Sequence, residues 1–186
     1  MATFRTPQIT HLSAEAVSRA QTFADAVIDT VNYRDSNQTK KQKIRDDHFV
    51  SKLGEEAVRA VFEARNCIVQ GPDYSIYRGK QKSWDSDLKI NALDVAVKTQ
   101  RRSAAKQYGL SWTFQDSPRR RDPVLDLPDA WVCFVVYEDL EAGYDCTVYP
   151  LLRIKQLIFD PPLLAHLSGK KKMVYLEKLQ KLKTFK

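Results

Sequence analysis

The sequence has 186 residues, of which 43% are hydrophobic and 28% charged, and these proportions are ordinary for one globular domain with its own core. No apolar run approaches the ~20 residues needed to cross a bilayer, and the N-terminal stretch lacks the basic-then-apolar layout of a secretory signal. We therefore expect a cytoplasmic, non-membrane protein. The formal net charge of +7 favours polyanionic partners, nucleic acid first, through counterion release.

The three cysteines, Cys67, Cys133 and Cys146, are widely spaced and fit neither a disulfide framework nor a zinc site. Cys67 and Cys133 lie in apolar runs, and we expect them in the core as small hydrophobic side chains. This usage agrees with an intracellular location, where thiols stay reduced.

Two helices are predicted before the first clear strand. Ser13 has the character of an N-cap, and the apolar residues after it recur at helical spacing, so a helix should run from there to about Tyr33. The basic run 40–45 should be a solvated helix face or a loop. A second helix should begin at residue 46 or 47 and end near Arg65.

Strands are expected in most of the remaining chain. Alternation and short apolar runs predict strands at 67–69, 86–90, 94–99 and 111–115. The continuous apolar run 131–137 should be a buried central strand that pairs with 144–149. A helix is expected at 150–159, and the lysine-rich segment after Gly169 is ambiguous. This order of elements indicates an α/β fold, with a mixed β-sheet flanked by helices.

The stretch SWDSDLKINALDVAVKTQ, residues 83–100, carries the strongest candidate chemistry. Alternation along the first strand places on one face Asp85, Asp87 and Lys89. Alternation along the second places on one face Asp94, Ala96, Lys98 and Gln100. If the strands form a hairpin, these groups converge, as phosphodiester hydrolysis requires: carboxylates hold a hard divalent cation and a lysine orients water. The alternative is a surface hairpin whose charged face is simply solvated.

These residues resemble the motif of the PD-(D/E)xK nuclease superfamily. In that motif an aspartate opens one strand, and an acid stands two residues before a lysine on the next strand. Asp87 matches the first aspartate and Lys98 matches the lysine. The second acid falls on Ala96, and Asp94, one pleat period earlier, could supply the missing carboxylate. Asp73 follows a proline, as in the letters PD, but stands too far before the lysine strand to be preferred.

The resemblance also implies a restriction-endonuclease-like fold and a glutamate on the helix before the sheet. In GEEAVRAVFEARN, residues 54–66, the family spacing selects Glu55 over Glu56, and the alternative is an ordinary solvated helix acid. The implied catalytic residues are Glu55, Asp87, Asp94 and Lys98. The implied cofactor is Mg²⁺, held by the three carboxylates of that set.

Polar and basic residues after the lysine strand are candidates for contacts with DNA phosphates, although such runs are often only solvated surface. They are Gln100, Arg101, Arg102, Lys106, Arg119, Arg120 and Arg121. We divide the expected single nuclease domain into a helical N-terminal segment (1–45), a catalytic core (46–160) and a basic C-terminal extension (161–186).

Over nearly its whole length the chain further resembles the small subunit of heterodimeric type IIS restriction endonucleases. The resemblance implies a large subunit, itself a nicking endonuclease, that recognises a site in double-stranded DNA and cuts one strand. This chain would cut the other strand, leaving a 5′-phosphate and a 3′-hydroxyl, and would have little activity alone. Two alternatives stay open: a homodimeric repair or recombination nuclease that acts on DNA structure, and a non-catalytic basic nucleic-acid-binding module.

Overall fold

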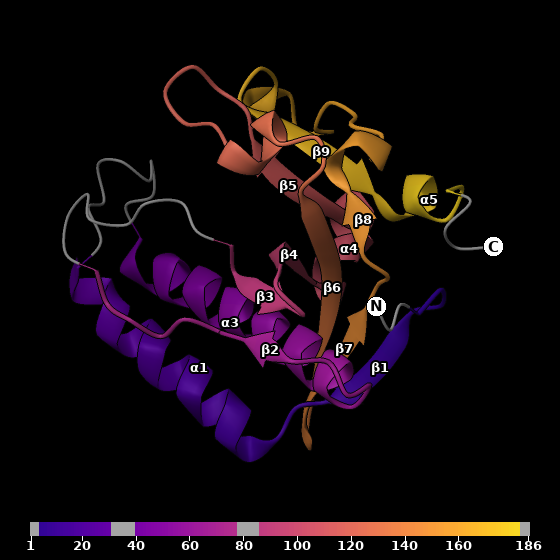
Figure 1. Cartoon of the computed structure of the whole chain (residues 1–186). Helices are drawn as coiled ribbons and strands as arrows, with labels where there is room; N and C mark the ends of the chain where they lie inside the picture. Colours follow the sequence, from indigo (N-terminus) through magenta and orange to yellow (C-terminus); the bar gives the residue numbers. More distant parts are fainter. Residues whose placement is uncertain (1–3, 31–39, 78–85, 183–186) are drawn as a thin grey trace.

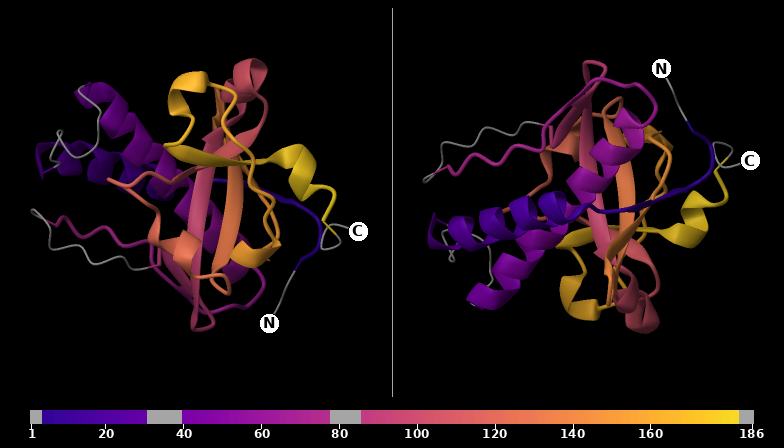
Figure 2. Two further views of the ribbon diagram at one scale, coloured as in Figure 1. Left: turned by 90° about the horizontal axis from the view of Figure 1, so that it is seen from above. Right: turned by 90° about the horizontal axis from the view of Figure 1, so that it is seen from below.

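The computed structural model of the chain describes residues 4–30, 40–77 and 86–182. In these ranges, two helices cover one face of a curled mixed β-sheet, and a small two-stranded sheet lies against the other face (Figure 1). The views from above and below in Figure 2 show the two helices crossing each other beside the sheet.

The first helix forms where its cap and apolar spacing predict it. β1 (Gln8–His11) leads into α1 (Ala14–Val27), whose N-cap Ser13 accepts a hydrogen bond at its Oγ from the backbone N–H of Ala16, at 3.2 Å. The α-helix ends at Val27 and a 3₁₀ turn (Ile28–Thr30) follows. The expected end at Tyr33 lies outside the described residues.

The second helix, α3 (Lys41–Glu63), begins about one and a half turns earlier than predicted. The basic run supplies its first residues, and Ile44 within that run is buried, so the segment is anchored to the core by one apolar side chain. The run is therefore a helix face with solvated lysines, one of the two forms that the sequence allowed.

The main sheet confirms the α/β class with a mixed sheet. Its strand order is β1-β7-β6-β4-β3-β2, with β8 also pairing with β6. β4 and β6 pair in parallel, whereas the other neighbours pair antiparallel. β6 lies in the middle, as its continuous apolar run predicts. The strands after β1 are β2 (Val69–Gln70), β3 (Leu88–Ile90), β4 (Leu93–Arg101), β6 (Trp131–Leu140), β7 (Gly143–Val148) and β8 (Leu152–Arg153).

The predicted helix at 150–159 is wrong. That segment contains β8 and a 3₁₀ turn (Ile154–Gln156) instead. Leu152 pairs with Val132 of β6 and is fully buried, so the segment gains more from extending along a central strand than from helical hydrogen bonds of its own.

The second sheet pairs β5 (Ser111–Gln115) with β9 (Lys171–Tyr175). β5 matches its predicted bounds, and β9 resolves the ambiguous lysine-rich segment. Both ends of the chain therefore contribute strands, β1 to the main sheet and β9 to the second. Short helical elements lie between the strands, namely α4 (Ala105–Tyr108) and 3₁₀ turns at Arg102–Ala104, Pro123–Asp126 and Ala165–Leu167, and α5 (Leu176–Leu179) follows β9.

Two apolar cores lie on opposite faces of the main sheet. One packs α3 residues such as Leu53 and Phe62 against Val95 and Val97 of β4. The other packs β5 against β6 and includes Ala96 of β4. All three cysteines are free and buried, as expected for Cys67 and Cys133. Within the described residues, no helix is both long and apolar enough to cross a membrane.

Candidate active site

Glu55 is held against the sheet by the glycine that precedes it. An added Cβ at Gly54 would stand 1.8 Å from Thr99 Oγ1, so only a glycine allows α3 to approach β4 this closely. Glu55 is consequently buried, with 2% of its surface exposed. The sequence predicts Glu55 as the helical acid, and its burial argues against an ordinary solvated helix glutamate.

Asp87 stands just before β3, and a backbone group of the neighbouring strand holds its carboxylate. Asp87 Oδ2 accepts a hydrogen bond from the N–H of Val97 on β4, at 2.7 Å. This contact ties the predicted first aspartate to the residue that directly precedes Lys98. Asp85, which the sequence places on the same strand face, lies outside the described residues.

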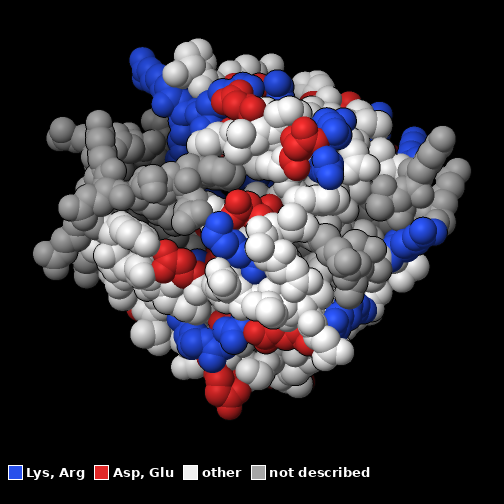
Figure 3. Space-filling view, in the orientation of Figure 1, with Lys and Arg blue, Asp and Glu red and all other residues white. Residues whose placement is uncertain are grey.

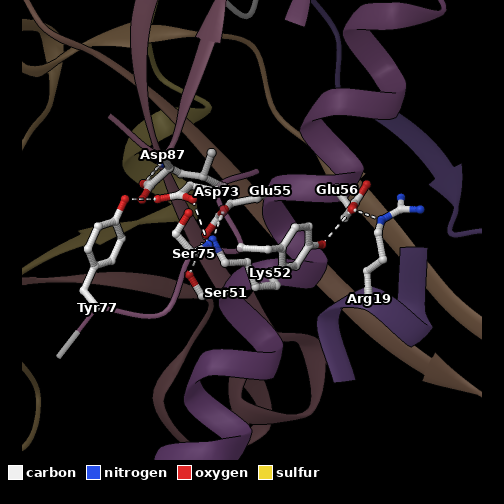
Figure 4. A network of polar contacts seen from close by, with 11 residues as sticks. Arg19, Ser51, Lys52, Glu55, Glu56, Asp73, Ser75, Tyr77 and Asp87 are labelled. Atoms are coloured by element: carbon white, nitrogen blue, oxygen red, sulfur yellow. Dashed lines mark hydrogen bonds and ion pairs between the residues drawn. The ribbon is translucent and has the colours of Figure 1, made fainter. Parts of the chain in front are cut away.

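Glu55 and Asp87 form one electrostatic unit, which we call the acidic pair. The pKa of Glu55 is raised to about 7, mainly by burial; the nearby charge of Lys52 opposes this shift and that of Asp87 adds to it. Figure 4 shows both side chains in one polar network with Lys52. Two carboxylates 32 positions apart in sequence are thus brought together by α3 and the start of β3.

Lys52 lies at this pair, and the sequence did not indicate it. Its Nζ is 2.6 Å from Glu55 Oε2, and only 7% of the residue is exposed. The ammonium also lies over the rings of Phe23 and Tyr74, 5.0 and 5.4 Å from their centroids. The one sequence signal was its spacing three residues before Glu55, on the same helix face.

Asp73, which the sequence argument set aside, belongs to the same network (Figure 4). Its Oδ1 accepts from the N–H of Ser75 at 2.9 Å, and its Oδ2 accepts from the hydroxyl of Tyr77 at 2.8 Å. Burial raises the pKa of Asp73, but these hydrogen bonds and the charge of Lys52 outweigh it, so the net shift is downward. Distance along the chain was misleading because the 72–77 segment folds back beside α3.

The neighbouring Glu56 is engaged elsewhere. Its Oε1 accepts from Arg19 Nε at 3.0 Å and from the hydroxyl of Tyr74 at 2.7 Å. These bonds fix α1 and the segment after β2 to α3, so Glu56 supports the wall of the site. Glu55, and not Glu56, therefore stays the predicted helical acid.

Lys98 extends toward the opposite face of the sheet from α3. Its Nζ donates to Asp122 Oδ2 at 2.8 Å and lies 4.7 Å from the centroid of the Phe114 ring. Asp122 also accepts from the backbone N–H of Gln115. The lysine is 22% exposed, so solvent and solutes reach it. Lys98 directly follows Val97, whose N–H binds Asp87, but the ammonium of Lys98 binds Asp122 instead.

Asp94 does not fill the position left by Ala96. In the hairpin register it lies opposite Lys89, whose Nζ is 2.6 Å from Asp94 Oδ1, and the hydroxyl of Ser86 donates to the same oxygen at 2.7 Å. These bonds lower the pKa of Asp94. Its side chain is 56% exposed, while Ala96 packs into the core against β5. The local ion pair across the hairpin is the reason the expected convergence fails for Asp94.

The carboxylates near Glu55 fit a divalent cation that needs few ligands from the protein. Among the described residues, no three His, Cys, Asp or Glu side chains are grouped closely enough to hold a metal ion. Mg²⁺ binds through one or two carboxylates and keeps several waters. Glu55 is buried and has a raised pKa, and Asp87 is half-buried; together they offer hard oxygen donors and negative charge that suit this ion. Glu55 and Asp87 are the residues that fit it.

Three candidate DNA contacts at the end of β4 already have partners within the chain. The amide of Gln100 donates to the carbonyl of Ser111 at 3.1 Å, Arg101 donates to the Tyr137 hydroxyl, and Arg102 pairs with Glu138 at 2.9 Å. They act as links between strands in this structure. Lys106 is exposed on α4.

The other candidates gather with lysines from distant segments. The backbone N–H of Asp116 donates to the carbonyl of Lys170, which joins the 116–121 loop to β9. Among the described residues, exposed or half-exposed cations here without an ion pair define what we call the basic surface: Arg119, Arg120, Lys170 and Lys171. Burial lowers the pKa of Lys171, and the charges of Lys43 and Arg120 lower it further.

Figure 3 shows Lys and Arg side chains gathered over this upper loop, beside a hollow in the same face of the molecule. Arg121 differs from its neighbours because it is paired with Asp116 and Asp126. The arrangement offers a phosphate backbone several uncommitted positive charges in one place.

The chain matches no protein-family model, no characterised protein and no solved structure.

Proposed function

We propose that this chain is a magnesium-dependent nuclease subunit with a restriction-endonuclease-like fold. The observation that carries the proposal is the acidic pair: Glu55 of α3 and Asp87 at β3, joined through Val97 to the strand of Lys98. The fold class, the helical acid and the strand aspartate are the parts of the PD-(D/E)xK resemblance that this arrangement supports.

Glu55 and Asp87 would hold the cation, without Asp94. Bound Mg²⁺ supplies charge neutralisation at a phosphate and lowers the pKa of a coordinated water. The chain's own contribution is to keep the two carboxylates fixed: Gly54 sets the approach of the helix, and the Val97 N–H orients Asp87.

Lys98 supplies the second positive charge of the proposed reaction. Asp122 and the Phe114 ring hold its ammonium in a defined position at a partly exposed site. A DNA phosphate that displaces Asp122 from this ammonium would gain a charge-assisted hydrogen bond. Asp122 is therefore a positioning residue for Lys98 in this proposal.

DNA is the proposed substrate because of the positive charge of the basic surface. The basic surface can bind a DNA backbone but has no element that reads base edges among the described residues, such as a helix-turn-helix. We therefore propose that a large, sequence-recognising subunit supplies specificity and cuts one strand. This chain then cuts the other, giving a 5′-phosphate and a 3′-hydroxyl.

The test is strand-resolved cleavage of end-labelled duplex DNA with Mg²⁺, with and without a sequence-recognising nicking subunit. Wild type and Asp87→Asn are compared, with Asp129→Asn as the matched control because Asp129 is exposed and paired only with surface cations. We expect Asp87→Asn to lose second-strand cleavage by at least a hundredfold, about 2.7 kcal/mol, and Asp129→Asn to keep it. Second-strand cleavage by Asp87→Asn at the wild-type rate would refute the proposal.

A second candidate function is a non-catalytic nucleic-acid-binding module. It is favoured by the ion pairs Lys98–Asp122 and Lys89–Asp94, which occupy charges that catalysis would use. Calorimetric titration with Ca²⁺ separates the two. Calcium binding that Asp87→Asn abolishes supports the nuclease, and DNA binding without any calcium site supports the module.

A further inference from the structure

The buried lysine at the acidic pair is not explained by the proposed reaction. Lys52 and Glu55 form an ion pair at 2.6 Å in which both side chains are less than a tenth exposed. Removing two charges from water costs several kcal/mol each, and the attraction between them often only offsets that cost. A hydrophobic pair of similar size would stabilise the fold at least as well, so stability alone is a poor reason for this pair.

The surroundings of Lys52 hold a cation in place. Phe23 of α1 and Tyr74 both present ring faces to the ammonium. Ser51 also donates to Glu55, at 3.2 Å, so the glutamate keeps an additional partner besides the lysine. The result is a single ammonium at the carboxylate that the proposed function assigns to a divalent cation.

A second carboxylate is available to the same lysine. Asp73 lies close enough for the charge of Lys52 to act on it, and it is fixed by Ser75 and Tyr77 (Figure 4). A lysine side chain has four flexible methylene groups, so its ammonium can exchange one carboxylate for another without movement of the helix.

We propose that Lys52 is an internal counter-cation of the acidic pair, which competes with a divalent cation for Glu55 and transfers to Asp73 when that cation binds. This inference rests on the proposed function. Lys52 acts through Glu55 and is a positioning residue. Its ammonium keeps the pair compensated in the metal-free protein and sets the cation concentration at which the site fills.

Calorimetric titration with Ca²⁺ on the full chain tests the competition without cleavage. Lys52→Met keeps the length of the side chain and removes its charge, so we expect Ca²⁺ to bind roughly tenfold more tightly than to wild type, ~1.4 kcal/mol. Lys155→Met is the control, because Lys155 is also 2.6 Å from an acid, Asp129, but on the surface. It should leave the affinity unchanged. Equal or weaker binding by Lys52→Met overturns the inference.

A second measurement uses the wild-type chain and does not depend on the variant folding. Nitrogen-15 NMR of lysine ammonium groups, with Lys52→Arg to assign the signal, should show a slowly exchanging Lys52 ammonium that shifts when Ca²⁺ saturates the site. A Lys52 signal that stays unchanged at saturation contradicts the transfer.

The outcomes also separate this inference from the proposed function. If wild type and Lys52→Met bind Ca²⁺ equally well, and Asp87→Asn does not, the metal site stands and only the counter-cation role is lost. If none of the three binds Ca²⁺, the proposed metal site fails and the inference fails with it. If Lys52→Met binds Ca²⁺ and the other two proteins do not, the result supports both the metal site and the counter-cation role of Lys52.

Discussion

Replacing Glu55 by glutamine should change how the stability of the metal-free protein depends on pH. Glu55 has a pKa of about 7 in the fold, against 4.5 for the free side chain, mainly because burial disfavours its charge. A folded-state pKa above the unfolded value means that the native protein binds the extra proton. Stability is therefore greatest below pH 4.5 with respect to this group and falls as the pH rises toward 7.

The size of the effect follows from the two pKa values. Their difference corresponds to roughly 3 kcal/mol, since each pH unit is ~1.36 kcal/mol. Urea unfolding in EDTA at pH 5 and pH 8 should show wild type losing most of this amount relative to Glu55→Gln. Asp87→Asn should reduce the loss, because the charge of Asp87 contributes to the raised pKa. Parallel pH profiles for wild type and Glu55→Gln would refute the electrostatic account of the acidic pair.

Two further predictions concern the approach of α3 to the sheet and the contact with DNA. Gly54→Ala should destabilise the fold by about 1–3 kcal/mol through overlap with Thr99. Adding Thr99→Ala to this variant should recover part of the loss, as measured by urea unfolding. Equal stability of Gly54→Ala and wild type would contradict the close contact. Arg120→Ala with Lys171→Ala should lower the slope of log affinity against log salt by about 2 in fluorescence anisotropy with duplex DNA. An unchanged slope would place the DNA elsewhere.

The strands and helices could be predicted where a continuous segment carries a clear pattern of apolar residues or a helix cap. The run 131–137 is apolar throughout because β6 is covered on both faces, and Ser13 caps α1 as a serine before a helix usually does. The prediction of a helix at 150–159 missed β8 because Leu152 is buried through long-range pairing with Val132 of β6, which no local pattern shows. Neither β1 nor β9 carries a local signal, since each is a short edge strand.

The candidate site could be predicted to the extent that its residues are fixed by local geometry. Glu55 and Asp87 are predicted site residues, and in the fold the charge of Asp87 acts on Glu55. Alternation puts Lys98 and Asp94 on the same strand face. It does not show that Asp122 binds Lys98 on that face, or that Lys89 lies opposite Asp94 in the register. These partners arrive from other segments of the chain.

Lys52 shows the limit most clearly. A lysine on a helix is solvated in most sequences, and its burial depends on α1 and the 72–77 segment closing over it. Only the three-dimensional arrangement identifies it as part of the site.

In the proposed function Glu55 and Asp87 form one divalent-cation site, and anomalous diffraction from crystals soaked in Mn²⁺ tests this most directly. We predict one strong anomalous peak within bonding distance of both carboxylates, ~2.2 Å for a hard cation with oxygen ligands, and its loss in Asp87→Asn crystals. A peak bound by Asp94 without Glu55, or no peak at either carboxylate at saturating Mn²⁺, would contradict the account.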